Sequence, residues 1–295
     1  MTLTGTNSYV IDCGNGEAIC IDPGPAIETH VNALAAECAR INSRLAWICL
    51  THGHPDHAPA AALLRARTGA KVAANANSRI AHDRDLNDGD TIATGNVVLQ
   101  TIAAPGHSSD HVVFYEGSER ALFTGDVVLG EGYVVVAPPD GDMRAYVRTL
   151  QRLRAEYAQA QTIYGGHGEP VRDPRAKLDE YLEHRRIREQ EIIGALKDGE
   201  RTVPELVRSI YARTDPKLWA AAARQILAYL VALEREGRVH SHETNSPLEP
   251  QDESLLNPPW STVVGPEHAA IVEEELGADL RIDRLRVYTL VTNSQ

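Results

Sequence analysis

Hydrophobic and polar positions follow two kinds of pattern over the first 165 residues. Short apolar runs, alternating or unbroken, predict strands at 8–12, 18–22, 45–50, 71–74, 97–103, 112–115 and 161–164. Apolar residues at helical spacing predict helices at 27–41, 59–68 and 143–157. Because strands and helices alternate along the chain, we predict an α/β fold built in layers.

The pattern changes to helices from residue 178 onward. Apolar spacing predicts helices at 180–196, from 202 onward and at 218–236, followed by a strand that begins near residue 237. Thr202 is followed by Glu205 at the spacing of a capping box, which marks a helix start. Three helices and a short strand predict a small winged-helix-like module.

Charge and cysteine content exclude several classes of protein. A net charge of −12 argues against broad, non-specific binding to nucleic acid, which requires a basic surface. The four cysteines lack C-x-x-C spacing and lie in apolar segments, which indicates buried, reduced thiols. We find neither a signal peptide nor a long apolar run, so we expect a cytoplasmic protein that binds no membrane.

The candidate chemistry begins where the predicted strand at 45–50 ends. His52, His54, Asp56 and His57 follow that strand within a few positions. Imidazole and carboxylate groups together are typical ligands of zinc and similar cations. Alternate positions in a tight turn direct His52 and His54 towards one cation, and Asp56 and His57 towards a second. The alternative is a histidine-rich surface loop.

Three later turns repeat this arrangement. His107, Asp126 and His167 each follow an apolar segment and a glycine that leaves room for the side chain. Residues at strand ends meet at one edge of a sheet in open α/β folds, so we expect these side chains to converge with the first turn. Four such turns together are more specific than any one of them.

The motif His52-x-His54-x-Asp56-His57, with His107, Asp126 and His167 downstream, resembles the metallo-β-lactamase superfamily of dinuclear hydrolases. The resemblance covers about residues 5–178 and implies an αββα sandwich. It implies a first metal bound by His52, His54 and His107, a second bound by Asp56, His57 and His167, and Asp126 as the bridge. Two divalent ions, most typically Zn²⁺, would share a hydroxide that Asp56 orients.

Two further residues are candidates for supporting roles. Asp22 ends the second predicted strand and could fix a ligating imidazole, or it could cap the turn that Pro23 and Gly24 make. His111 lies four residues after His107 and could contact substrate or support the metal ligands. A structural hydrogen bond at the start of its strand is the alternative for His111.

Segments 129–132 and 184–189, with the helical module, narrow the resemblance to the β-lactamase-like protein 2 group. Members of that group are associated with cleavage of single-stranded RNA. The helical module could therefore read nucleic acid or cover the metal site as a lid. Acidic and basic residues balance within this module, which favours the lid.

The end of the chain differs from the pattern of that group, in which a strand precedes the Gly5-Thr6-Asn7 motif. Here an alternating segment at 284–291 follows a predicted helix at 267–276. We predict that this strand takes the place of the missing edge strand beside residues 9–12. The chain would then be circularly permuted, or a homodimer would exchange the strand. The alternative is an appendage without fixed structure.

These patterns give a provisional domain map. We predict a catalytic domain at 1–178, a winged-helix-like module at 179–243, a polar, proline-rich linker at 244–262 and a helix–strand tail at 263–295 that completes the catalytic sheet.

Three functions are compatible with the sequence. The first is hydrolysis of a small ester, thioester or lactam, and the second is metal-dependent cleavage of single-stranded RNA, a phosphodiester. The third is a non-catalytic RNA-binding protein with structural metals. A set of seven ligands argues against the third, because structural zinc is closed by four ligands.

Overall fold

The computed structural model describes residues 5–244, 248–259, 282 and 284–291. The chain divides into two compact units. One consists of residues up to 134 together with 148–181, and the other of 135–147 together with the residues from 182 onward. Within the described ranges, no helix is both long enough and apolar enough to cross a membrane.

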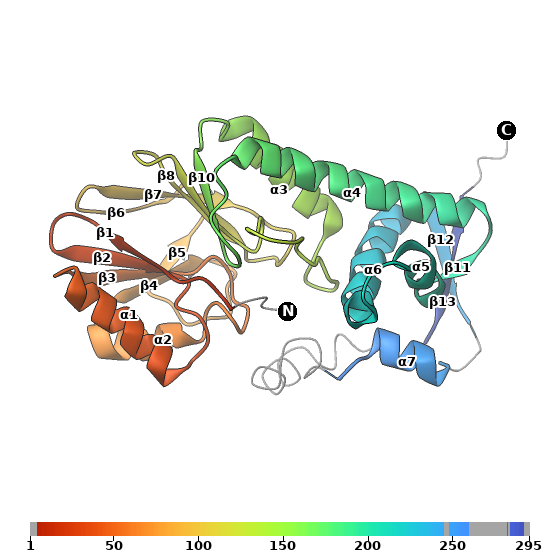
Figure 1. The fold of residues 1–295 in the computed structure, drawn as a ribbon, viewed down its shortest axis with the longest axis horizontal. Helices are drawn as coiled ribbons and strands as arrows, with labels where there is room; N and C mark the ends of the chain where they lie inside the picture. Colours follow the sequence, from red (N-terminus) through yellow and green to blue (C-terminus); the bar gives the residue numbers. More distant parts are fainter. Residues whose placement is uncertain (1–4, 245–247, 260–281, 283, 292–295) are drawn as a thin grey trace. The chain divides into compact units, whose positions relative to one another are not determined.

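The first sheet carries helices on one face (Figure 1). Its strands lie in the order β1 (Tyr9–Asp12), β2 (Glu17–Ile21), β3 (Arg44–Cys49), β4 (Lys71–Asn75) and β5 (Arg84–Leu86). Helices α1 (Glu28–Arg40) and α2 (Ala60–Thr68) bury apolar side chains against this sheet. Val31 and Leu64 from the helices join Ile48 and Leu50 in one cluster, which stabilises this layer by removing apolar surface from water.

The second sheet packs against the first. Its strands lie in the order β10 (Thr162–Gly165), β9 (Ala121–Gly125), β8 (Val112–Glu116), β7 (Val97–Ala103) and β6 (Thr91–Thr94). Ile19 and Cys49 of the first sheet share a buried cluster with Leu99 and Phe114 of the second. The cluster explains why both sheets have unbroken apolar stretches, since one of their faces is buried against the other sheet.

Helix α3 (Met143–Glu156) supplies the fourth layer, where Tyr157 at its end packs edge-on against Tyr115 of β8. The ring centroids are 5.1 Å apart. The predicted αββα order of layers is thus confirmed, whereas the short strands β5 and β6 were not predicted. All four cysteines are buried and free, as expected.

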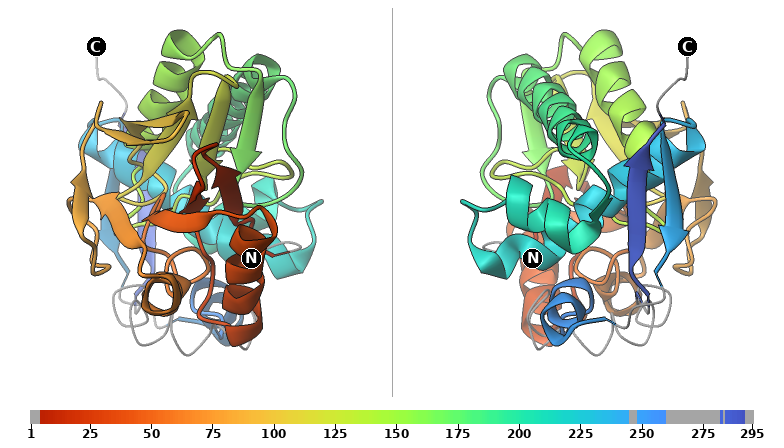
Figure 2. Two further views of the ribbon diagram at one scale, coloured as in Figure 1. Left: turned by 90° about the vertical axis from the view of Figure 1, so that its left-hand side faces the viewer. Right: turned by 90° about the vertical axis from the view of Figure 1, so that its right-hand side faces the viewer.

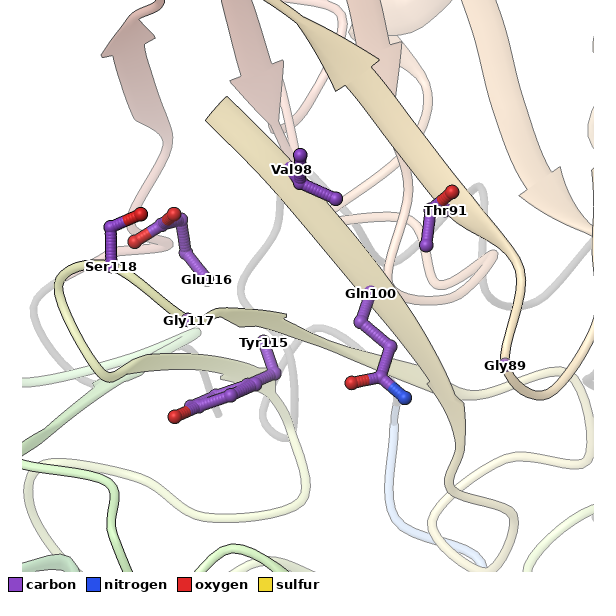
Figure 3. Close-up of a pocket in the computed structure, with 8 residues that line it drawn as sticks. All are labelled: Gly89, Thr91, Val98, Gln100, Tyr115, Glu116, Gly117 and Ser118. Carbon is purple, nitrogen blue, oxygen red and sulfur yellow. The ribbon is translucent and has the colours of Figure 1, made fainter. Parts of the chain in front are cut away.

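A pocket of about 500 Å³ lies on the second sheet, on the face opposite to the core (Figure 3). Thr91, Gln100 and Tyr115 are among its eight lining residues. Because no lining residue is a histidine or an aspartate, this pocket is separate from the candidate ligands described below.

The second unit has the elements of a winged helix. They are the end of α4 (Pro174–Lys197), β11 (Arg201–Thr202), α5 (Val203–Ile210), the short 3₁₀ helix η1 (Pro216–Leu218), α6 (Trp219–Arg235) and β12 (Val239–Glu243). The predicted capping box is confirmed. The Thr202 hydroxyl accepts from the Glu205 N–H at 3.4 Å, and the Glu205 carboxylate accepts from the Thr202 N–H at 2.7 Å.

The prediction that the strand at 284–291 takes the place of a missing edge strand beside residues 9–12 is wrong. Strand β13 (Arg286–Leu290) pairs antiparallel with both β11 and β12 in a three-stranded sheet, and β12 and β13 lie side by side in Figure 2. Tyr288 of this strand is buried, so its apolar side covers the helical unit instead of the catalytic sheet. Strand β13 therefore completes the three-stranded sheet of the winged-helix unit, and the chain shows no circular permutation among its described residues.

The stretch predicted as a linker also has structure. Helix α7 (Pro250–Leu256) lies within it and buries Leu255 and Leu256. The linker was predicted from its prolines. However, proline in the first turn of a helix, as in α7, is compatible with helix formation. The helix predicted at 267–276 lies outside the described residues.

Candidate metal centre

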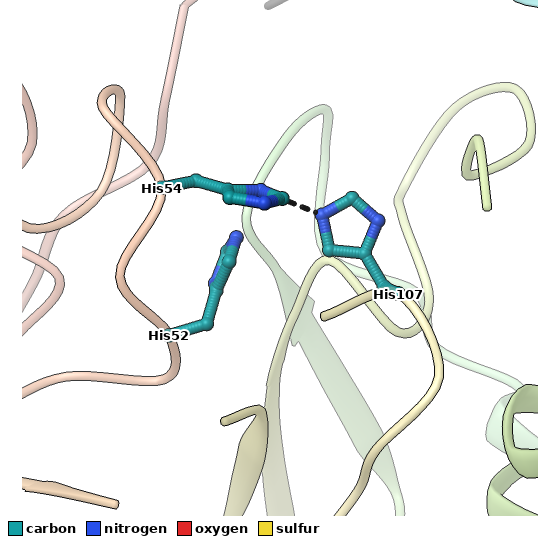
Figure 4. Close-up of side chains that lie close together, drawn as sticks. All are labelled: His52, His54 and His107. Atoms are coloured by element: carbon teal, nitrogen blue, oxygen red, sulfur yellow. Dashed lines mark hydrogen bonds between the residues drawn. The ribbon is translucent and has the colours of Figure 1, made fainter. Parts of the chain in front are cut away.

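The turn after β3 and the segment between β7 and β8 bring three imidazoles together (Figure 4). One nitrogen each of His52, His54 and His107 lies within 4.8 Å of the others. His54 Nδ1 and His107 Nε2 are 2.9 Å apart. Three nitrogens this close could ligate one cation, as the sequence predicted for the first metal.

A second group contains Asp56, His57 and His167, whose ligand atoms also lie within 4.8 Å of one another. Asp56 Oδ2 is 3.6 Å from His57 Nε2 and 3.4 Å from His167 Nε2. His167 comes from the turn after β10, so the group joins segments more than a hundred residues apart. It is the set that the sequence predicted for the second metal.

Asp126, at the end of β9, lies between these two groups. Its Oδ1 is 3.4 Å from His57 Nε2 and 3.4 Å from His167 Nε2, while its Oδ2 is 3.7 Å from His107 Nε2. One oxygen of the carboxylate therefore faces each group, which is the arrangement that a bridging ligand requires.

Several atoms at this centre lack the partner that buried polar atoms normally have. Within the described chain, His52 Nε2, His57 Nε2 and Asp126 Oδ1 are buried without a hydrogen-bond partner. A buried polar atom without a partner is costly, so such an atom indicates an ion or a water in the functional protein. Nitrogen and carboxylate donors in these positions fit divalent cations such as Zn²⁺.

Burial and neighbouring imidazoles keep His52 and His54 neutral. Burial, followed by the nearby His57 and His54, lowers the pKa of His52 well below its ordinary value. Burial and His107 likewise lower the pKa of His54 to about 4. Both rings are therefore unprotonated at neutral pH, which is the form that ligates a cation.

In the second group, nearby carboxylates determine the direction of the histidine pKa shifts. Burial alone would lower the pKa of His57 and of His167, but the carboxylates of Asp126 and Asp56 outweigh it. They raise the pKa of His57 well above its usual range and that of His167 to about 10. Burial alone would raise the pKa of Asp126, yet His57 and His167 hold it far below its ordinary value. A bound cation would balance the same carboxylate charges and would take the place of a proton on these histidines.

Asp22 contacts the turn that carries the ligands. Its Oδ2 lies 2.9 Å from His57 Nδ1 and accepts from the Thr51 hydroxyl at 2.6 Å, and its Oδ1 accepts from the Thr51 N–H at 2.7 Å. Because the carboxylate accepts the proton on Nδ1 of His57, the Nε2 of that ring is left facing the centre. Of the two roles considered for Asp22, the structure therefore places it against a candidate ligand.

Thr51 had no role in the sequence interpretation. Its hydroxyl is 3.0 Å from His52 Nδ1. Since the hydroxyl proton is donated to Asp22, the hydroxyl accepts from His52 Nδ1–H, and Nε2 of His52 is left available. A hydroxyl residue between a strand and a histidine motif was the only signal for this role.

His111 is fully buried and lies against two candidate ligands. Its ring stacks on that of His52, with centroids 4.6 Å apart, and its Nε2 accepts from the Asp126 N–H at 3.1 Å. His111 thus holds the backbone of the shared aspartate. Contact of His111 with substrate stays a prediction.

Two glycines leave the space that these side chains occupy. A Cβ atom on Gly166 would lie 2.5 Å from Asp126 Oδ1 and 2.6 Å from His57 Cε1. A Cβ atom on Gly125 would lie 2.4 Å from the Thr51 hydroxyl, and its backbone has a φ of +46°. Gly125 and Gly166 are therefore both sterically required, because any side chain at either position would clash with these residues.

Asp22→Asn is expected to weaken zinc binding by about 10- to 100-fold, because the amide can no longer fix both Thr51 and His57. Competition with a chromogenic chelator measures this affinity. The matched control is Asp12→Asn, an exposed aspartate at the end of β1, for which we expect no change. Equal affinity in Asp22→Asn and the unmodified protein would contradict the positioning role.

Comparison with known proteins identifies two family regions. Residues 1–82 and 74–167 match the family described as the metallo-beta-lactamase superfamily. Residues 202–246 match the beta-lactamase associated winged helix domain.

Named relatives cover most of the chain. A beta-lactamase-like protein 2 homolog of Caenorhabditis elegans is 32% identical over 249 residues, which are 81% of this chain and 82% of that protein. An atrochrysone carboxyl ACP thioesterase of Aspergillus chevalieri is 32% identical over 218 residues, 71% of this chain and 68% of that protein.

Solved structures share the fold. A metallo-beta-lactamase family protein from Thermus thermophilus has a TM-score of 0.68 at 23% identity, over 80% of this chain and 91% of that one. A beta-lactamase domain protein from Burkholderia ambifaria has a TM-score of 0.70 at 19% identity, over 81% and 85%.

Proposed function

Because the chain belongs to the metallo-β-lactamase superfamily, we propose that it is a hydrolase that uses two divalent cations, with Zn²⁺ the best match to its donors. The observation that carries the proposal is the placement of Asp126. Its two oxygens face two separate three-residue groups, at 3.4 Å and 3.7 Å from the nearest histidine nitrogens.

The candidate ligands and the residues that contact them have different proposed roles. His52, His54 and His107 would hold one cation, Asp56, His57 and His167 the other, and Asp126 both. When bound, a pair of cations supplies a hydroxide at neutral pH and polarises the bond to be cleaved. Asp56, whose carboxylate lies beside His57 and His167, would orient that hydroxide. Asp22, Thr51 and His111 keep the ligands in place through the contacts described above.

We propose an acyl compound, that is a thioester, an ester or a lactam, as the substrate. The similarity to a protein named as an acyl-carrier-protein thioesterase supports a thioester. Charges in the winged-helix unit also favour a small substrate. Arg235 is paired with Asp142 at 2.7 Å, and Arg238 with Glu189 at 2.8 Å. The positive charges of these two arginines are therefore already neutralised by carboxylates of the same unit.

A second candidate is cleavage of single-stranded RNA. The similarity to a beta-lactamase-like protein 2 homolog covers 81% of the chain. It favours this candidate because the resemblance to that group, described in the sequence analysis, implies cleavage of single-stranded RNA. A pair of cations can attack a phosphodiester as well as an acyl group.

A substrate panel separates the two candidates. The panel contains an acyl thioester, S-lactoylglutathione, nitrocefin, bis-p-nitrophenyl phosphate and labelled single-stranded RNA. We expect the thioesters to be hydrolysed fastest, with the activity lost in Asp56→Ala and His107→Ala. Cleavage of RNA that is lost in the same variants would establish the nuclease instead. Activity that persists in both variants would refute the proposal.

A further inference from the structure

The segment Gly5–Tyr9, termed here the N-terminal strap, is bound to the turn that carries His167. The Asn7 N–H donates to Gly166 O at 2.7 Å, and the Asn7 side-chain amide donates to Gly165 O at 3.1 Å and to Gly168 O at 2.8 Å. The Tyr9 hydroxyl donates to Gly165 O at 2.6 Å. A short loop of glycines has little of its own to fix its shape, so these bonds define it.

The strap also contacts two candidate ligands directly. The carbonyl oxygen of Gly5 lies 2.9 Å from His167 Nδ1, which must donate to it, so Nε2 of His167 faces the centre. The Thr6 hydroxyl donates to Asp56 Oδ2 at 3.1 Å. This is the carboxylate oxygen that lies 3.4 Å from His167 Nε2.

These contacts reach one of the two ligand groups. Asp56 and His167 both belong to the group predicted for the second cation. In the other group, His52 is held by the Thr51 hydroxyl, and His54 and His107 contact each other at 2.9 Å. The contacts of the strap with candidate ligands are thus confined to the second group, whereas Asp22 and Thr51 support one histidine of each group.

We infer that the strap positions the Asp56–His57–His167 group, so that Thr6 and Asn7 set the affinity of the second cation and leave that of the first unchanged. The inference rests on the proposed two-cation site. Thr6 acts through Asp56 and Asn7 through the turn of His167, and both are positioning residues. Contacts to ligating residues typically change cation affinity by about 10- to 100-fold.

The test is zinc affinity in two backgrounds that each retain one group. His57→Ala leaves the three-histidine group complete, and His54→Ala leaves the Asp56–His57–His167 group complete. Thr6→Val, which keeps the shape and removes the hydroxyl, is added to each. We expect about 10-fold weaker zinc binding in the His54→Ala background and no change in the His57→Ala background, measured by chelator competition.

Three further variants serve as controls. Thr6→Ser keeps the hydroxyl and should restore the affinity. Ser8→Ala removes a hydroxyl in the same segment that contacts His30 at 3.0 Å instead, and it should have no effect. Asn7→Ala should weaken the same site as Thr6→Val, so the inference can be tested if one variant fails to fold.

The outcomes are distinct from those of the substrate panel, because zinc titration needs no turnover. Equal weakening in both backgrounds would show that the strap stabilises the fold in general, and it would overturn the inference. Unchanged affinity in Thr6→Val and Asn7→Ala would overturn it too. A strap effect on zinc in a protein without hydrolase activity would refute the proposed function alone.

Discussion

Asp126→Ala is expected to lower kcat/KM by roughly 10³-fold on the substrate that the panel identifies. Asp126 faces both ligand groups, so its loss should impair both cations, whereas loss of one histidine impairs one. We expect metal analysis to show less than one zinc per chain after dialysis. The effect corresponds to about 4 kcal/mol of transition-state stabilisation.

Folding should be affected much less, because Asp126 is a member of neither hydrophobic core cluster and its carboxylate lies against the other candidate ligands. Circular dichroism and thermal unfolding of the metal-free protein provide that measurement. Asp85→Ala, in which an exposed aspartate is removed, is the control for a lost carboxylate. Near-normal turnover by Asp126→Ala would contradict the site assignment.

Removal of metal by a chelator is expected to abolish hydrolysis, and addition of Zn²⁺ should restore it. Burial raises the pKa of the Cys49 and Cys20 thiols far above the ordinary value, so neither is an activated nucleophile that could replace the metal. Zinc should also stabilise the fold, by about 2.7 kcal/mol at a free concentration of 100 times Kd.

Thermal unfolding with increasing zinc measures this stabilisation, and magnesium at the same concentration tests the preference of nitrogen-rich ligands for zinc. Full activity in protein whose metal content is near zero would contradict the role of metal in catalysis.

Local patterns predicted a layered α/β fold and the positions of the candidate ligands at strand ends, whereas the αββα order and the division of the ligands into two groups were implied by the family resemblance. Apolar runs mark strands that are buried between two sheets, and His52, Asp126 and His167 follow such runs directly. Once the strand ends share an edge, short turns leave these side chains few places to lie.

The pairing of β13 could not be predicted in this way. Its alternating pattern shows that one face is buried, but it does not show which strands it pairs with. Both β1 and β12 could have paired with this strand. It pairs with β12, where Tyr288 is buried in the helical unit. The short helix α7 was missed for a related reason, because its two leucines are buried by tertiary packing alone.

The strap contacts were also beyond the sequence. Thr6 and Asn7 are polar residues before a strand, and local patterns do not indicate their partners, which lie 50 residues away for Thr6 and 158 and 161 residues away for the Asn7 side chain. Only the folded chain shows that Gly5 and His167 meet.

Gly166 has a consequence for how this protein could change its chemistry. One wall of the centre is bare main chain, with no room for even a methyl group between it and Asp126 or His57. A wall without a side chain cannot be reshaped by replacing one amino acid with another. New substrate preferences in proteins of this design must therefore come from the residues on the other sides of the centre, while the spacing between the two ligand groups stays fixed.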